Sequence, residues 1–310
     1  MSFLLAHLTD THIGPLPRPT LRELVGKRIT GYVNWKRGRH RTHDMEQLAR
    51  IVADIRAQRP DHVAMTGDVL NIGLAAEFAP ALAWLETLGA DEDVSFTPGN
   101  HDAYAADTMA LLSRTFARHA RPDGSRAREA VYPYLRVRGP IALIGLNSGL
   151  PTAPFMATGR LGARQRGDFA AILEDAGARG LARVVMIHHP PLASGAATSR
   201  RLGDAPEFEA IVRRFGAELV LHGHNHTRSV AHVLSRAART AGGRIAVVGA
   251  PSASSIMREP SRYRAAYHLF RIDLSDGLWK VTARARGPVD GGEDIGDLGA
   301  IDVLRDTRTR

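Results

Sequence analysis

The chain contains no cysteine among its 310 residues, which excludes structural disulfides, thiolate metal ligands and a cysteine nucleophile. Any bound metal would need His, Asp, Glu or Asn ligands. Long apolar runs are missing as well. No stretch approaches the ~18 uninterrupted apolar residues of a transmembrane helix, and the short apolar run at the N-terminus lacks the basic residues of a signal peptide. We therefore expect a cytoplasmic protein.

The remaining composition is that of a globular protein, with 44% hydrophobic and 24% charged residues. The net charge of +9 fits either a solvated Arg-rich surface or attraction to an anion such as a nucleotide, a phosphate or a membrane. We find no repeat and no linker. We therefore predict one domain at residues 1–286 and a weakly ordered Gly/Asp-rich tail at residues 287–310.

Short apolar runs rich in β-branched residues alternate with segments of helical periodicity, which predicts an α/β fold with buried sheets. The predicted strands are 3–8, 62–66, 94–97, 141–146, 183–188, 218–222 and 244–249. The predicted helices are 45–58, 77–89, 106–119, 163–179 and 206–216. Two later runs, 267–274 and 278–286, predict a hairpin at a sheet edge.

Metal-competent residues follow five of the predicted strands. They are Asp10 and His12; Asp68; Asn100, His101 and Asp102; His188 and His189; and His222, His224 and His226. Binding sites in open α/β sheets form beyond the carboxyl ends of the strands, so these residues should converge. A single Asp or His at such a place is more often a helix cap or a turn residue. Five sets together favour a metal site.

The spacing of these residues fits two metal ions. One residue separates Asp10 from His12, and one residue separates His224 from His226. An extended backbone therefore points both members of each pair the same way. Asp68 has two carboxylate oxygens and can bridge. Mixed N and O ligands suit Mn, Fe, Zn, Co or Ni better than Ca or Mg. Two such ions about 3.5–4 Å apart can clamp a phosphoryl group and generate hydroxide.

The motifs Asp10-Thr11-His12, Gly67-Asp68, Gly99-Asn100-His101-Asp102, His188 and Gly223-His224-Asn225-His226 resemble those of the calcineurin-like metallophosphoesterases in content and order. The resemblance covers about residues 3–250 and, through PGNHD and HHPP, looks closest to the class III cyclic-nucleotide phosphodiesterases. It implies a four-layer α/β/β/α sandwich with two mixed sheets and a metal site at the C-terminal ends of the strands.

The resemblance also implies a role for each motif residue. The first metal would be held by Asp10, His12, Asp68 and His226, and the second by Asp68, Asn100, His188 and His224. Manganese or an iron–manganese pair is favoured, with zinc and cobalt as alternatives. His101 would contact a phosphoryl oxygen or protonate the leaving group, oriented by Asp102. A metal-bridging hydroxide would attack a phosphodiester in line, with cyclic nucleotides among the candidate substrates.

Two further histidines lie beside the motif residues. We interpret His222 as a buried neighbour of the ligands and His189 as a candidate substrate contact.

Residues 14–44 combine apolar residues at near-helical spacing with many Arg and Lys residues, which is typical of a basic amphipathic helix. Three interpretations stay open: a helix packed on its own domain, docking to a membrane or lipid substrate, or contact with a nucleotide or nucleic acid. The segment follows the first ligand motif directly, so we expect it to border the mouth of the active site. Arg200 and Arg201 should lie on another loop at its rim.

This segment motivates an alternative enzyme hypothesis, a phosphohydrolase acting on a membrane-associated or lipid-linked substrate such as a UDP-diacylglucosamine. A non-catalytic metal-binding scaffold is a third hypothesis, against which the complete ligand set and His101 argue. We find no dedicated nucleic-acid module, so nucleic acid is the less favoured partner. A homodimer is suggested by the resemblance alone.

Overall fold

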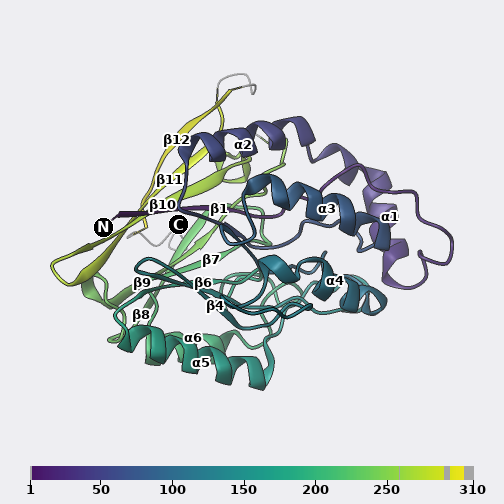
Figure 1. Ribbon diagram of the computed structural model, residues 1–310. Coiled ribbons are helices and arrows are strands. Elements are labelled where there is room, and N and C mark those ends of the chain that lie inside the picture. Colours follow the sequence, from purple (N-terminus) through teal and green to yellow (C-terminus); the bar gives the residue numbers. More distant parts are fainter. Residues whose placement is uncertain (1, 258, 290–293, 304–310) are drawn as a thin grey trace.

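The computed structural model describes residues 2–257, 259–289 and 294–303. Two six-stranded mixed sheets pack face to face, and helices cover the outer face of each sheet (Figure 1). The molecule therefore has the four α/β/β/α layers that the motif resemblance implied.

The first sheet has the strand order β12-β11-β10-β1-β2-β3. Its strands are β1 Ser2–Leu8, β2 His62–Met65, β3 Val94–Phe96, β10 Tyr267–Ser275, β11 Leu278–Pro288 and β12 Ile295–Ile301. Strands β1, β2 and β3 run parallel, whereas β10, β11 and β12 are antiparallel to their neighbours. The carboxyl ends of β1 to β3 consequently lie at one edge of the sheet.

The second sheet has the order β4-β5-β6-β7-β9-β8. Its strands are β4 Tyr134–Arg138, β5 Ile141–Gly145, β6 Ala182–Met186, β7 Leu219–His222, β8 Ser229–Leu234 and β9 Arg244–Gly249. The four central strands are parallel, and β4 and β8 are antiparallel at the two edges.

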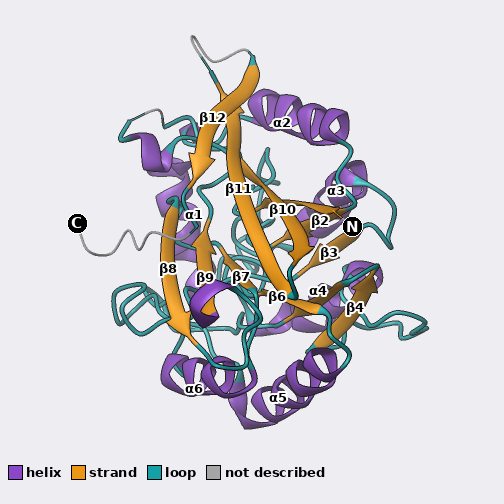
Figure 2. Cartoon of the chain, turned by 90° about the vertical axis from the view of Figure 1, so that its left-hand side faces the viewer, coloured by secondary structure: helices purple, strands orange, loops and turns teal. Residues whose placement is uncertain are grey.

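The helices are α1 Lys27–Arg37, α2 Met45–Gln58, α3 Phe78–Leu85, α4 Met109–Thr115, α5 Gly162–Ala178 and α6 Ala205–Phe215. Helix α2 lies against the first sheet, and α5 and α6 cover the second (Figure 2). Asp44 caps α2 by accepting hydrogen bonds from the backbone amides of Glu46 and Gln47, which fixes the point where the chain leaves the basic segment.

Three apolar clusters hold these layers together. One lies between the sheets and contains Leu5, Leu143, Met186, Leu221 and Phe270. The other two fill the spaces between each sheet and its helices. The central parallel strands are buried on both faces, which explains why they read as nearly continuous apolar runs.

The strands β4, β8 and β12 were not predicted. The prediction of a weakly ordered tail is wrong for Ile295–Ile301, because this segment pairs with β11; residues 290–293 and 304–310 lie outside the described residues. The predicted hairpin β10–β11 is not at the sheet edge, because β12 pairs outside it and β10 pairs with β1 on the other side. Across the described ranges, we find no helix with the length and apolar character needed to cross a membrane.

The predicted basic amphipathic helix is shorter than the apolar spacing suggested. Residues 21–26 form turns, and Gly26 has a φ of 79° directly before α1. This left-handed conformation interrupts the helix. Helix α1 packs Tyr32 and Trp35 against Leu16, Ile72 and Tyr104. The helix is thus attached to its own domain through one face.

Candidate metal centre

All seven predicted metal ligands lie in loops that follow β1, β2, β3, β6 and β7. Five of them have positive φ: Asp10 (54°), His12 (43°), Asp68 (56°), His224 (70°) and His226 (50°). Each such conformation costs on the order of 1–3 kcal/mol in a non-glycine residue, and such strain concentrates at functional sites. The loops therefore hold these side chains in one place at the expense of backbone strain.

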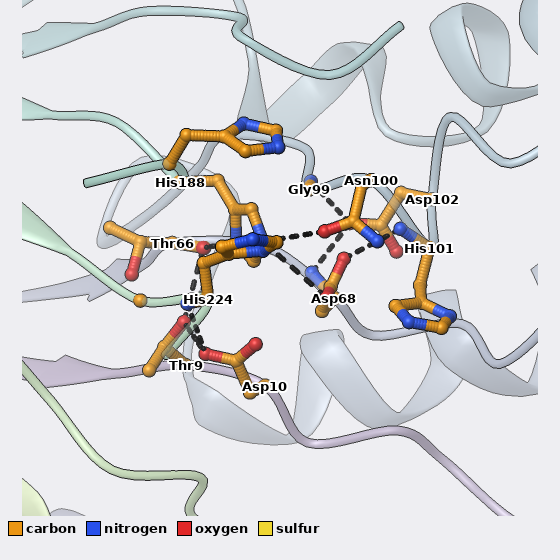
Figure 3. Close-up of polar contacts among 12 residues, drawn as sticks. Thr9, Asp10, Thr66, Asp68, Gly99, Asn100, His101, Asp102, His188 and His224 are labelled. Atoms are coloured by element: carbon orange, nitrogen blue, oxygen red, sulfur yellow. Dashed lines mark hydrogen bonds and ion pairs between the residues drawn. The ribbon is translucent and has the colours of Figure 1, made fainter. Parts of the chain in front are cut away.

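One group of donor atoms surrounds the imidazole of His188. Its Nε2 lies 3.4 Å from Asp68 Oδ2, 3.3 Å from Asn100 Oδ1 and 3.2 Å from His224 Nδ1 (Figure 3). Its Nδ1 faces the carbonyl of Thr66 at 2.7 Å, which directs Nε2 into the cluster. These four residues are the predicted ligand set of the second metal.

A second group forms around Asp10. Its Oδ2 accepts hydrogen bonds from Thr9 Oγ1 (2.7 Å) and the amide of His224 (3.0 Å), and its Oδ1 lies 3.1 Å from His226 Nε2. One ligand atom each from Asp10, His12 and His226 lie within 4.8 Å of one another. His12 Nδ1 faces the carbonyl of Leu70 at 2.9 Å, which leaves Nε2 for a metal.

The two groups are contiguous through Asp68. Ligand atoms of Asp10, Asp68 and His188 also lie within 4.8 Å of one another. The donor set contains only nitrogen and oxygen, and the buried Asp10 Oδ1 accepts no hydrogen bond. A buried polar atom without a partner is costly. The residues therefore fit two transition-metal ions sharing Asp68.

The electrostatics of the centre also suit cations. Burial by itself raises the pKa of the Asp68 carboxyl, but His188, His101 and His12 together hold it well below its usual range. Burial likewise lowers the pKa of His188, but Asp68, Asp10 and the Thr66 carbonyl together raise it to about 9. The carboxylates are thus ionised and attract positive charge at this position.

The structure corrects the predicted role of Asp102. Its carboxylate accepts hydrogen bonds from the backbone amides of Asp68 (2.7 Å), Val69 (2.9 Å), Leu70 (3.0 Å) and Gly99 (2.8 Å). It therefore fixes the loop that carries Asp68 and does not orient the His101 ring. No sequence motif indicates this role, because the partners are backbone atoms.

His101 is oriented by the carbonyl of Asn71, which contacts its Nδ1. A proton on Nδ1 leaves Nε2 as an acceptor, and burial and Arg39 lower the pKa of His101 to about 3. A neutral ring of this tautomer can accept a proton at Nε2 but has none to donate there. The predicted contact of His101 with a phosphoryl oxygen or a leaving group stays a prediction.

Arg39 reaches into the centre and was not singled out in the sequence. It begins the short 3-10 helix Arg39–Arg41 after α1. Its Nη1 lies 2.9 Å from His101 Nε2, and its Nη2 lies 2.9 Å from His12 Nε2. Within the described chain, no carboxylate oxygen lies within 4.0 Å of its nitrogens. Several neighbouring arginines are equivalent in sequence, so only the fold distinguishes this one.

Three further histidines lie beside the predicted ligand sets, and a ring nitrogen of His189 lies within 4.8 Å of ligand atoms of His188 and His224. His189 is buried, its Nδ1 faces Ser148 Oγ at 2.8 Å, and its ring centroid lies 4.7 Å from that of His224. His222 is buried, as predicted. His43, which the sequence did not indicate, packs beside His12 with ring centroids 4.8 Å apart and the rings tilted by 59°.

A cavity of about 410 Å³ opens over the centre. It is lined by Asn34, Arg39, Thr42, His43, Asp68, Asn100, His101, Ala157, Arg200, His224, His226, Ser255 and Met257. Arg200 donates from Nη2 to the carbonyl of His224 at 3.1 Å. The basic segment therefore borders the site, as predicted, and Arg200 lies at its rim.

Comparisons with known proteins agree with this geometry. The family described as Calcineurin-like phosphoesterase matches residues 3–228. A probable cyclic nucleotide phosphodiesterase of Synechococcus sp. is 26% identical over 230 residues, covering 73% of this chain and 74% of that protein.

Among solved structures, a dimetal phosphatase from Danio rerio superposes with a TM-score of 0.59 at 13% identity, covering 96% of this chain and 99% of that one. A purple acid phosphatase from yellow lupin superposes with a TM-score of 0.57 at 10% identity, covering 93% of this chain and 52% of that one. At these identities, the two structures show a shared fold.

Proposed function

This chain belongs to the calcineurin-like phosphoesterase family, and from that premise we propose that it hydrolyses a phosphodiester, with cyclic nucleotides as the first substrates to test. The observation that carries the proposal is the convergence of Asp68, Asn100 and His224 on His188 Nε2, contiguous with the group around Asp10. The similarity to a probable cyclic nucleotide phosphodiesterase supports a diester substrate.

The protein's own residues would position the substrate. When bound, two metal ions supply charge neutralisation and activation of a water molecule. Arg39 lies between a metal ligand and His101, so its guanidinium can donate to phosphoryl oxygens from the side of the basic segment. One nitrogen of His12 cannot accept from Arg39 and also bind a metal. A metal at His12 would therefore free Arg39 for the substrate.

The proposal is tested by hydrolysis of a soluble aryl phosphodiester with metal-stripped protein reconstituted with Mn²⁺. We expect turnover that depends on the metal and exceeds turnover of the matching aryl phosphomonoester. Asp68→Ala and Asn100→Ala should abolish turnover, whereas Asp93→Ala, which changes an exposed carboxylate, should not. Full activity of either ligand variant would contradict the proposed site, and a preference for the monoester would contradict the diester assignment.

A second candidate substrate is a phosphate ester held in a membrane. Leu21 and Val25 are 88% and 76% exposed on the segment that borders the pocket, which is unusual for apolar side chains beside a soluble-substrate site. Absence of turnover on soluble diesters by protein that holds two metals per chain would favour this candidate.

A further inference from the structure

Exposed apolar side chains gather around the mouth of the metal pocket. Of the 12 large hydrophobic residues that are exposed in the described chain, eight belong to three short segments. These residues, which we call the apolar rim, are Leu21, Val25, Ile29, Val33, Phe155, Met156, Ile256 and Met257. Single exposed apolar residues are ordinary, but a contiguous group beside a pocket marks an interaction site.

The three segments are neighbours in space. Lys27 Nζ donates to the carbonyl of Met156 at 3.0 Å, which ties α1 to the second segment. The amide of Ile256 donates to the carbonyl of Thr42 at 3.1 Å, which ties the third segment to the chain after α1. Asn34, Ala157 and Met257 all line the metal pocket. The apolar rim and the pocket therefore belong to one face.

The exposure of the rim follows from how α1 is anchored. Arg28 is 5% exposed and binds Asp107 through Nη2 at 2.6 Å and the carbonyl of Gly73 at 2.9 Å. Tyr32 and Trp35 pack on the domain. With those residues turned inward, Ile29 and Val33 remain outside at 52% and 38% exposure.

The same segment carries a basic surface. Arg18, Arg22, Lys36, Arg37 and Arg41 are exposed, and in the described part of the chain none of them has a carboxylate within 4.0 Å. Glu23 is the only acidic residue between positions 11 and 43, and its carboxylate accepts hydrogen bonds from Thr20. The partner of this face should therefore combine negative charge with an apolar interior.

We propose that the apolar rim docks onto an anionic lipid membrane, with the metal pocket facing the bilayer. Apolar side chains would enter the boundary between headgroups and acyl chains, and the basic residues would attract anionic headgroups. A second copy of the chain is a poorer occupant because it would bring the same basic residues face to face. The proposal concerns where the protein sits and holds for either substrate considered above.

The proposal is tested by co-sedimentation of the full chain with phosphatidylcholine vesicles that contain or lack phosphatidylglycerol. We expect binding to the anionic vesicles that weakens as salt is raised, and much weaker binding to the neutral ones. The double variant Leu21→Ser/Val25→Ser should bind at least about tenfold more weakly, because each buried methylene adds to membrane affinity. Turnover of the soluble diester should be unchanged.

The matched control is Leu234→Ser/Leu274→Ser. These side chains are 58% and 46% exposed at the ends of β8 and β10, and neither residue lines the pocket. This variant should bind vesicles like the wild type. Absence of binding to anionic vesicles, or equal loss in both double variants, would overturn the proposal. So would a wild-type dimer in light scattering that the Leu21→Ser/Val25→Ser variant dissociates, because the rim would then be a subunit interface.

Discussion

Replacing Asp102 with asparagine should destabilise the protein and weaken its metal centre. Asp102 is fully buried, and each of its oxygens accepts two backbone N–H groups: Oδ1 those of Val69 and Leu70, and Oδ2 those of Asp68 and Gly99. In Asp102→Asn one oxygen becomes an NH₂ group, which cannot accept. Two backbone donors are then left buried without a partner, whichever way the amide turns.

Each unsatisfied donor costs about 1–3 kcal/mol, so the free energy of unfolding should fall by about 2–6 kcal/mol. Burial and the charge on Asp68 raise the pKa of Asp102 to about 7. The comparison therefore belongs at about pH 8.5, where the wild-type carboxylate is ionised.

The assay is urea unfolding of the metal-stripped proteins, followed by determination of Mn²⁺ content after reconstitution. Asp93→Asn is the matched control, because it makes the same change in an exposed carboxylate. The control should lose no more than about 0.5 kcal/mol. A free energy of unfolding for Asp102→Asn within about 1 kcal/mol of the wild type, with the metal content retained, would refute this account of the loop.

Three other variants test separate parts of the structure. Arg39→Gln should lower kcat/KM on the diester about 100-fold with unchanged metal content, whereas Arg37→Gln, which removes an exposed charge from the same segment, should not; loss of metal in Arg39→Gln would indicate a structural role instead. Glu218→Ala should reduce the free energy of unfolding by about 3–5 kcal/mol in urea, because it leaves the guanidinium of Arg183, whose side chain is 2% exposed, without its carboxylate partner. A change below about 1 kcal/mol would contradict this expectation. Burial raises the pKa of Asp54, but hydrogen bonds from Arg286 and from the Tyr267 hydroxyl lower it by more, so this pKa lies below the ordinary value for an aspartate. Its ionised form therefore stabilises the fold at neutral pH, and the Tm difference between wild type and Asp54→Asn should shrink as the pH falls through that lowered pKa; a difference that is constant from about pH 7 to pH 3 would count against the ion pair.

The sequence predicts the sheet framework well because its parallel strands are buried on both faces and read as apolar runs. The three missed strands lie at sheet edges, where one side of the strand meets solvent. Strand β4 carries Arg136 and Arg138, and β12 has two glycines and one aspartate among its seven residues. The strand conformation of β4 and β12 depends on pairing with a neighbour more than on their own composition.

The candidate ligands could be predicted because each motif is local and places Asp, His or Asn directly after a strand. The supporting contacts could not. Asn71 contacts His101 through its backbone carbonyl oxygen, and the Asp102 carboxylate binds backbone amides. Every residue type has these backbone atoms, so the sequence does not indicate which of them make such contacts. Arg39 is one of many arginines in its segment, and its position depends on how Gly26 ends the turn before α1 and how Arg28 anchors the helix.

The metal centre also joins the two sheets, which has a consequence for folding. The amide of His224 donates to Asp10 across 214 positions of sequence, and His188 Nδ1 meets the Thr66 carbonyl across 122. Closing such long loops costs conformational entropy before the contacts between their ends can contribute any favourable free energy. Contacts of this kind therefore form late in folding. The centre should therefore be completed only after both sheets have formed and docked, so the ability to bind metal reports the last step of assembly.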